Sequence, residues 1–181
     1  MKRFGFPILL LLIVGAMVGI FALGNRGDAP PSKKPDEKPR LGTQFPNQGQ
    51  EHIQPGAEHA AYNSSPPTSG PHYPQPAPWG IKDQGIADET LIHNLEHGGI
   101  VINYQPDIGQ AEIEQLEDIF RQLPKSGGFG SIKAILVPRS QNQKPISLTA
   151  WTYKLDLDRV DEAQIKQFYA DHIDKGPELV P

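Results

Sequence analysis

Prolines restrict what the chain before Glu89 can form. The sequence contains 19 prolines, and they concentrate before residue 80. Proline lacks a backbone N–H and fixes φ, so it interrupts helices and is excluded from central strands. We therefore expect regular secondary structure mainly from Glu89 onward. The preceding chain should supply a terminal segment, a linker and an irregular covering of the core.

A run of apolar residues without any charge occupies residues 6–24, directly after Lys2 and Arg3. Its length is close to the ~20 residues that a membrane-spanning helix needs. The basic residues before it favour a cytoplasmic N-terminus. We expect residues 1–24 to be a single-pass anchor in the cell membrane, with the rest of the chain outside the cytoplasm, in the periplasm or at the cell surface. The alternative is a signal peptide cleaved after Gly24, which would give a secreted protein.

Two proline-rich segments of different composition follow. Residues 25–50 alternate proline with charged residues and contain almost no apolar side chain. Such a segment cannot repay the entropy of ordering, which predicts a disordered linker. Residues 51–88 also contain histidine, tyrosine and tryptophan. We expect this second segment, called the wrap from here on, to be irregular but ordered, with Tyr62, Tyr73 and Trp79 packed on a core.

Hydrophobic periodicity predicts the regular elements of the folded domain, residues 51–181. The expected order is a helix over 89–98, a strand over 100–104, a helix over 110–123, strands over 132–138 and 145–155, and a helix over 161–173. This order predicts an α+β fold, with a small three- to four-stranded sheet and flanking helices. A strand–helix–strand crossover followed by a hairpin also occurs in thioredoxin-like folds.

The composition excludes several classes of function. The sequence contains no cysteine, which rules out disulfides, thiolate metal ligands and a cysteine nucleophile. The formal net charge is −4 and there is no basic excess, so we expect no nucleic-acid partner. The membrane is the one partner that the sequence indicates, and it identifies no protein partner.

The stretch HNLEH places two histidines and a glutamate on one short helix. Asp88 is expected to be its N-cap, and Gly98 its C-terminal stop. His93 and His97 are four residues apart, so their imidazoles share a helix face that Glu96 borders. Two imidazoles at this spacing can hold one metal ion. Histidines here can also simply stabilise the C-terminal end of the helix.

Other histidines lie in the wrap, where His72 follows a rigid Ser-Gly-Pro turn. Imidazole-rich sites without thiolates suit zinc or copper(II). The two remaining histidines, His52 and His172, are expected at the surface. The candidate metal ligands are therefore His72, His93 and His97, with His59 as the candidate fourth.

Two alternatives stay open beside metal binding. In the first, the chain is a metal-dependent hydrolase in which Glu96 acts as the general base. The pattern His-x-x-Glu-His occurs in inverted zinc peptidases, but this domain is short for such an enzyme and Gly98 ends the helix at once. In the second, the histidines form a buried hydrogen-bond network in a structural or interaction module that binds no metal. The sequence leaves open whether the chain is an enzyme.

The stretches YNSSPPTSGPHYP and DETLIHNLEHGGIVINY, with a tryptophan between them, resemble a bacterial family known as domain of unknown function 3105. The resemblance covers roughly residues 50–178. It implies secreted or single-span membrane proteins and no established activity. Many members carry a cysteine just after the tryptophan that corresponds to Trp79, and this chain has Gly80-Ile81 there, so a role of that thiol cannot apply. The matching motif positions are His59, Tyr62, Pro66, Pro67, Ser69, Gly70, His72, His93, Glu96, His97 and Gly98.

Overall fold

The computed structural model describes residues 38–178 and residue 180. The expected membrane anchor and the linker up to residue 37 lie outside the described residues. Within the part of the chain that is described, no helix is both long and apolar enough to cross a bilayer. The segment Pro39–Pro181 forms one compact unit.

The folded unit is α+β, as expected, with three helices and one mixed sheet among the described residues. The helices are α2 (Asp88–Glu96), α3 (Gln110–Arg121) and α4 (Glu162–His172). The strands are β1 (Thr43–Gln44), β2 (Gly80–Ile81), β3 (Ile100–Tyr104), β4 (Ala134–Pro138), β5 (Ile146–Ala150) and β6 (Tyr153–Leu157). Their order across the sheet is β1-β6-β5-β3-β4-β2.

The sheet has six strands, which corrects the expectation of three or four. The two additional strands, β1 and β2, are two residues long and come from the proline-rich part of the chain. They lie at the two edges, where β1 pairs antiparallel with β6 and β2 pairs parallel with β4. Edge positions tolerate neighbouring prolines because only one side of the strand must hydrogen-bond.

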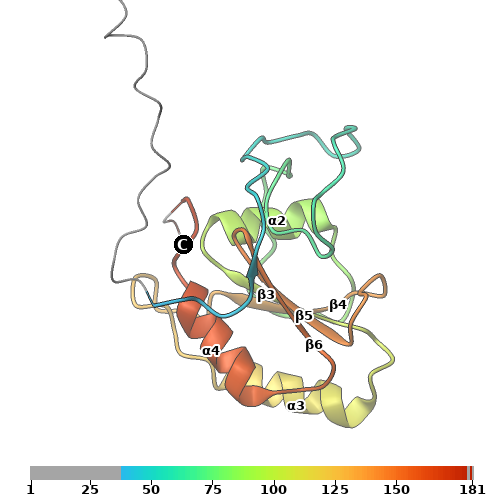
Figure 1. The fold of residues 1–181 in the computed structure, drawn as a ribbon, viewed down its shortest axis with the longest axis vertical. Helices are drawn as coiled ribbons and strands as arrows, with labels where there is room; N and C mark the ends of the chain where they lie inside the picture. The colour runs from blue at the N-terminus through green and yellow to red at the C-terminus, as the bar shows by residue number, and fades with distance from the viewer. Residues whose placement is uncertain (1–37, 179, 181) are drawn as a thin grey trace, which may run out of the picture. The chain divides into compact units, whose positions relative to one another are not determined.

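The two faces of the sheet bury different helices, with α3 and α4 on one side and α2 on the other (Figure 1). Because successive side chains of a strand point to opposite faces, the central strands β3 and β4 contribute to both cores. The core under α3 and α4 contains Ile102, Leu136, Leu148, Leu116, Phe120, Ile165 and Phe168. The smaller core under α2 contains Val101, Ile135, Leu91 and Leu95, with Trp79 packed against it.

The predicted strand over 145–155 is a hairpin of two strands. β5 ends at Ala150, Thr152 takes a positive φ of 62°, and β6 then runs antiparallel to β5. The apolar alternation changes phase at the turn, from even-numbered residues up to Ala150 to odd-numbered residues from Trp151 onward. One continuous strand would keep the same phase, so the prediction of a single strand was wrong.

Asp88 is not the N-cap of α2, which corrects a second expectation. Ala87 occupies that position and makes no side-chain cap. The Asp88 carboxylate instead accepts two hydrogen bonds from the Arg139 guanidinium, at 3.0 Å from Nε and 2.7 Å from Nη2. The stop at Gly98 is confirmed, because α2 ends at Glu96 and Gly98 has a φ of +77°.

Residues 39–50 belong to the folded unit, although their composition placed them in the linker. The Leu41 N–H donates to Asp171 Oδ2 at 2.8 Å, and the Phe45 N–H donates to Thr152 O at 2.8 Å. Main-chain hydrogen bonds and β1 hold this segment against the sheet. Composition does not detect such pairing, since it reports mainly apolar burial.

His172 is buried, which corrects the expectation that it lies at the surface. Its side chain packs against the rings of Phe168 and Tyr153, and the residue is 2% exposed. Its Nε2 donates to Leu41 O at 2.8 Å. Burial lowers the pKa of His172 below the ordinary value of a histidine. This imidazole is therefore neutral in the folded protein at neutral pH.

We predict that His172 makes the fold sensitive to mild acid. The unfolded chain binds a proton at the ordinary histidine pKa of about 6.5, whereas the folded protein binds it only at lower pH. The stabilising contribution is complete above that pH and is lost as the pH falls toward the lowered pKa. Urea unfolding at about pH 7.5 and about pH 5.5 should show a smaller loss in a His172→Gln variant, which keeps a side-chain N–H but does not titrate. Equal losses in both proteins would contradict this.

Candidate metal centre

Three imidazoles and a carboxylate converge where the wrap meets the C-terminal half of α2. One ligand atom from each of His52, His72, His93 and Glu96 lies within 4.8 Å of the other three. The wrap supplies the first two residues, and α2 supplies the last two. His72, His93 and Glu96 are buried, whereas the His52 side chain is 45% exposed. We call these four residues the His52 group.

Main-chain pairing within the wrap brings His52 beside His72. The two residues form a parallel β-bridge. The Ile53 N–H donates to His72 O at 2.8 Å, and the His72 N–H donates to Glu51 O at 2.9 Å. The Tyr62 hydroxyl donates to Pro71 O at 2.6 Å and fixes the turn before His72. The two imidazole rings consequently lie 4.8 Å apart, edge to face.

His93 presents a free nitrogen to the group. Its Nδ1 donates to Tyr73 O at 2.8 Å, which leaves the lone pair on Nε2. Burial lowers the pKa of His93, so the imidazole is neutral at neutral pH. A metal ion binds the neutral form of imidazole. His93 is thus in the protonation state and orientation that coordination requires.

The Glu96 carboxylate is 1% exposed and still ionised. Burial opposes ionisation, but the hydrogen bond from Gln50 and the neighbouring His72 imidazole outweigh it, and the pKa of Glu96 lies below its ordinary value. Gln50 Nε2 donates to Oε1 at 2.8 Å. Oε2 lies 3.0 Å from His72 Nε2 and 3.5 Å from His52 Nε2. One oxygen is therefore held by an amide, while the other faces two imidazoles.

His72 lies between two hydrogen-bond acceptors. Its Nδ1 donates to Gly70 O at 2.8 Å, and its Nε2 faces Glu96 Oε2. A neutral imidazole carries only one N–H, so the short contact on Nε2 requires either a second proton or a cation. Ligand atoms around a tetrahedral zinc ion lie about 3.3 Å apart. The distances of 3.0 and 3.5 Å at Glu96 Oε2 bracket that value, so these two pairs of ligand atoms are spaced as they would be around a zinc-sized ion.

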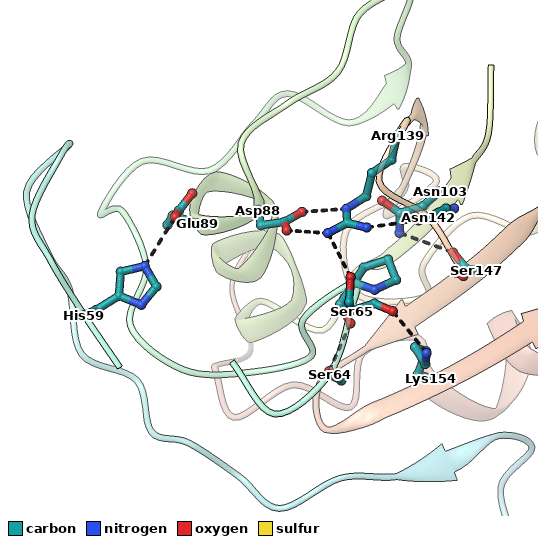
Figure 2. A network of polar contacts seen from close by, with 11 residues as sticks. His59, Ser64, Ser65, Asp88, Glu89, Asn103, Arg139, Asn142, Ser147 and Lys154 are labelled. Carbon is teal, nitrogen blue, oxygen red and sulfur yellow. Dashed lines mark hydrogen bonds and ion pairs between the residues drawn. The ribbon is translucent and has the colours of Figure 1, made fainter. Parts of the chain in front are cut away.

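The structure brings some of the predicted ligands together with Glu96, which was predicted as a general base, and separates others. His72, His93 and Glu96 meet in the His52 group, but His59 does not. His59 Nε2 lies 3.3 Å from Glu89 Oε1 in the first turn of α2 (Figure 2). Its Nδ1 donates to Ala60 O. The wrap turns back at this point, so that His59 reaches the other end of the helix.

His97 belongs to a second group of ligand atoms, beside the first. The imidazoles of His93 and His97 lie 4.5 Å apart. His97 groups with Glu96 and with Glu178 near the C-terminus, again within 4.8 Å. Burial lowers the pKa of His97, with a further contribution from His93. The spacing of the HNLEH stretch therefore does place both imidazoles on one face, but beside different partners.

Sequence reasoning missed His52 as a member of the site. The residue follows the linker expected from composition, and no motif surrounds it. Only the β-bridge between His52 and His72 places it there, and a pairing between irregular segments leaves no periodic pattern in the sequence. Its exposed side chain is compatible with the surface position that we expected.

Two histidines of the metal-free protein should carry their proton on opposite ring nitrogens. At about pH 8, where histidine is neutral, we predict an Nδ1-protonated tautomer for His93, because Tyr73 O accepts from that atom. We predict the Nε2-protonated tautomer for His172, which donates to Leu41 O. Long-range ¹H–¹⁵N correlation spectra distinguish the two forms, and His172 is an internal control. A proton on Nε2 of His93 would mean that this nitrogen does not present a lone pair to the group.

Comparison with known proteins gives a family but no activity. A sequence model of a protein family of unknown function, DUF3105, matches residues 52–180. No match to a curated protein or to a solved structure was found. The match spans the wrap from residue 52, strands β2 to β6, all three described helices and every residue of the His52 group. The chain belongs to the DUF3105 family.

Proposed function

We propose that this protein is a metal-binding domain that holds one zinc or copper(II) ion through His52, His72, His93 and Glu96. The observation that carries the proposal is the convergence of three imidazoles on a buried, ionised carboxylate. Three nitrogen ligands and one oxygen ligand suit tetrahedral zinc, and they also suit copper(II). A metal ion would supply the positive charge that the contact between His72 Nε2 and Glu96 Oε2 requires.

The proposed ligands are already oriented by their outer hydrogen bonds. His93 donates from Nδ1 to Tyr73 O, and His72 donates from Nδ1 to Gly70 O. Metal-bound histidines commonly donate their other ring N–H to a carbonyl or carboxylate, which fixes the tautomer and the ring orientation. Gln50 does the equivalent for Glu96 by donating to Oε1. These contacts support a preformed site rather than one that must be assembled on binding.

We further propose that the domain lies outside the cytoplasm, attached to the cell membrane by the apolar segment 6–24. The support for this is the length of that segment and the basic residues before it. No property of the metal site depends on it.

The contacts of Glu96 favour a ligand over a general base. Its Oε1 accepts from Gln50, and its Oε2 faces His72 and His52. A general base needs an oxygen within reach of the proton of a bound water, and these contacts orient the carboxylate toward the imidazoles instead. The hydrolase alternative therefore has no specific contact in its favour.

A structural module without metal is the second candidate, and one observation favours it. If His72 is doubly protonated, it donates to both Gly70 O and Glu96 Oε2, and the buried network is satisfied. The His72–Glu96 contact would then be a buried ion pair that fixes the wrap on α2. Such a pair needs no metal, so its contribution to stability should not change when a chelator is added.

As an architecture, we propose a thioredoxin-like core for β3–α3–β4–β5–β6–α4. The support is the order β6-β5-β3-β4, in which β3 and β4 are parallel and β5 and β6 form an antiparallel hairpin. This likeness carries no redox function, because fold does not imply function and the chain contains no cysteine.

The metal content of the purified protein tests the proposed function. The full-length chain should be prepared in detergent without a histidine tag, dialysed, and assayed by mass spectrometry for bound metals. We expect about one tightly held equivalent of zinc or copper, as four ligands of this kind hold one ion. His52→Ala should weaken binding by more than the ~100-fold that loss of an outer hydrogen bond can cost. Since His52 is half exposed, this change should leave the fold intact.

His59→Ala is the matched control, because it also removes an imidazole from the wrap but one that contacts Glu89 instead. It should retain the metal with unchanged affinity. A wild-type protein that contains no metal and takes up none on titration would overturn the proposal. If thermal unfolding were also unaffected by chelator, the ion-pair alternative would take its place.

A further inference from the structure

We propose that the protein binds a second divalent metal ion through Glu96, His97 and Glu178, so that Glu96 bridges two ions. This inference rests on the proposed function, because the first ion shares Glu96 with the second. One ligand atom from each of the three residues lies within 4.8 Å of the other two. The C-terminal segment thereby becomes part of the metal centre.

Close packing holds the C-terminal segment against the end of α2. The Glu178 N–H donates to Glu96 O at 3.0 Å. A Cβ atom at Gly176 would lie 2.1 Å from Glu96 O, and one at Gly98 would lie 2.9 Å from Asp174 Cα. Only glycine permits this approach of two backbones. Glu178 is consequently fixed next to His97 by main-chain contacts that do not depend on its own carboxylate.

Lys133 also holds the C-terminal segment against the end of α2. Its buried ammonium donates to His97 O at 2.5 Å and to Val180 O at 2.8 Å. It also lies 3.4 Å from Asp174 Oδ1. The lysine therefore ties the end of α2 to the C-terminal segment on both sides of Glu178. This clamp keeps the three proposed ligands close even before an ion binds.

Neither nitrogen of His97 is committed to a hydrogen bond. Its Nδ1 is buried and has no partner. Its Nε2 lies 3.7 Å from Glu178 Oε2, which is beyond hydrogen-bond distance. A buried ring nitrogen without a partner is costly, and a metal ion bound to Nδ1 would remove that cost, with the ring proton then on Nε2. The unpartnered nitrogen is an independent indication that His97 binds an ion.

The two proposed ions would share a carboxylate, as in two-metal sites whose ions lie about 3.5–4 Å apart. Glu96 has two oxygens, and the His52 group and the second group both include it. The second ion should bind more weakly, because the first ion and the ammonium of Lys133 both repel it. Glu178 is also 46% exposed, so less of this site is shielded from water.

Metal titration of the full-length chain in detergent tests the inference. Zn²⁺ added to the metal-free protein should bind in two phases of about one equivalent each, the second weaker, as a shared carboxylate requires. Cu²⁺ should give an isolated electron paramagnetic resonance signal at the first equivalent. At the second, the signal should broaden and a half-field transition should appear, because two spins this close couple. Ions scattered over the surface would not produce that coupling.

Glu178→Gln removes the carboxylate of the second group and keeps its size and its main-chain hydrogen bond. This variant should retain the first equivalent and lose the second one together with the coupled signal. Glu51→Gln is the matched control, since Glu51 is exposed and belongs to neither group. His97→Gln is a second variant that should behave like Glu178→Gln.

The possible results separate this inference from the proposed function. A wild-type protein that takes up one equivalent and shows no spin coupling overturns the second site and leaves the first. A second equivalent that survives in Glu178→Gln overturns the assignment of Glu178. If the wild-type protein binds neither Zn²⁺ nor Cu²⁺, both proposals fall.

Discussion

The arrangement of the candidate metal centre depends on the buried carboxylate of Glu96. Glu96 is 1% exposed and ionised. Burying one charged group costs roughly several kcal/mol unless nearby hydrogen bonds or opposite charges stabilise it. The compensation comes from an amide on one oxygen and imidazoles on the other. Because His72 already donates its Nδ1 proton to a carbonyl, the balance requires one more positive charge beside Glu96. A metal ion and a second proton on His72 are the two ways to supply it, and they predict different chemistry.

Two irregular segments, the wrap and the C-terminal segment, contact the end of α2 near the Glu96 carboxylate. The wrap brings His52 and His72 to one side of the helix end, together with Gln50 directly before it. The C-terminal segment brings Glu178 to the other side, where glycine contacts and Lys133 hold it. The sheet supplies a fixed platform for both, since β3 begins directly after the glycines that end α2. The residues of both ligand groups are therefore concentrated at one helix terminus.

The sequence predicted those parts of the structure that depend on local patterns. Apolar spacing located β3, α3 and α4, and Gly98 located the end of α2. The HNLEH stretch correctly pointed to this helix end as the place where polar side chains gather. The pairing of His52 with His72 and the detour of His59 to Glu89 were not predictable, because both depend on how irregular segments fold back on the core. β1 and β2 were not predictable either, because edge strands of two residues are too short to show a periodic pattern.

Crystals of the protein grown with zinc would show whether an ion occupies the His52 group, through data collected on both sides of the zinc absorption edge. We predict an anomalous difference peak within coordination distance of His72 Nε2, His93 Nε2 and Glu96 Oε2, with His52 as the fourth ligand. A density map with no anomalous peak there, and with His72 Nε2 still in direct contact with the Glu96 carboxylate, would contradict it. The group would then be an ion pair that fastens the wrap to α2.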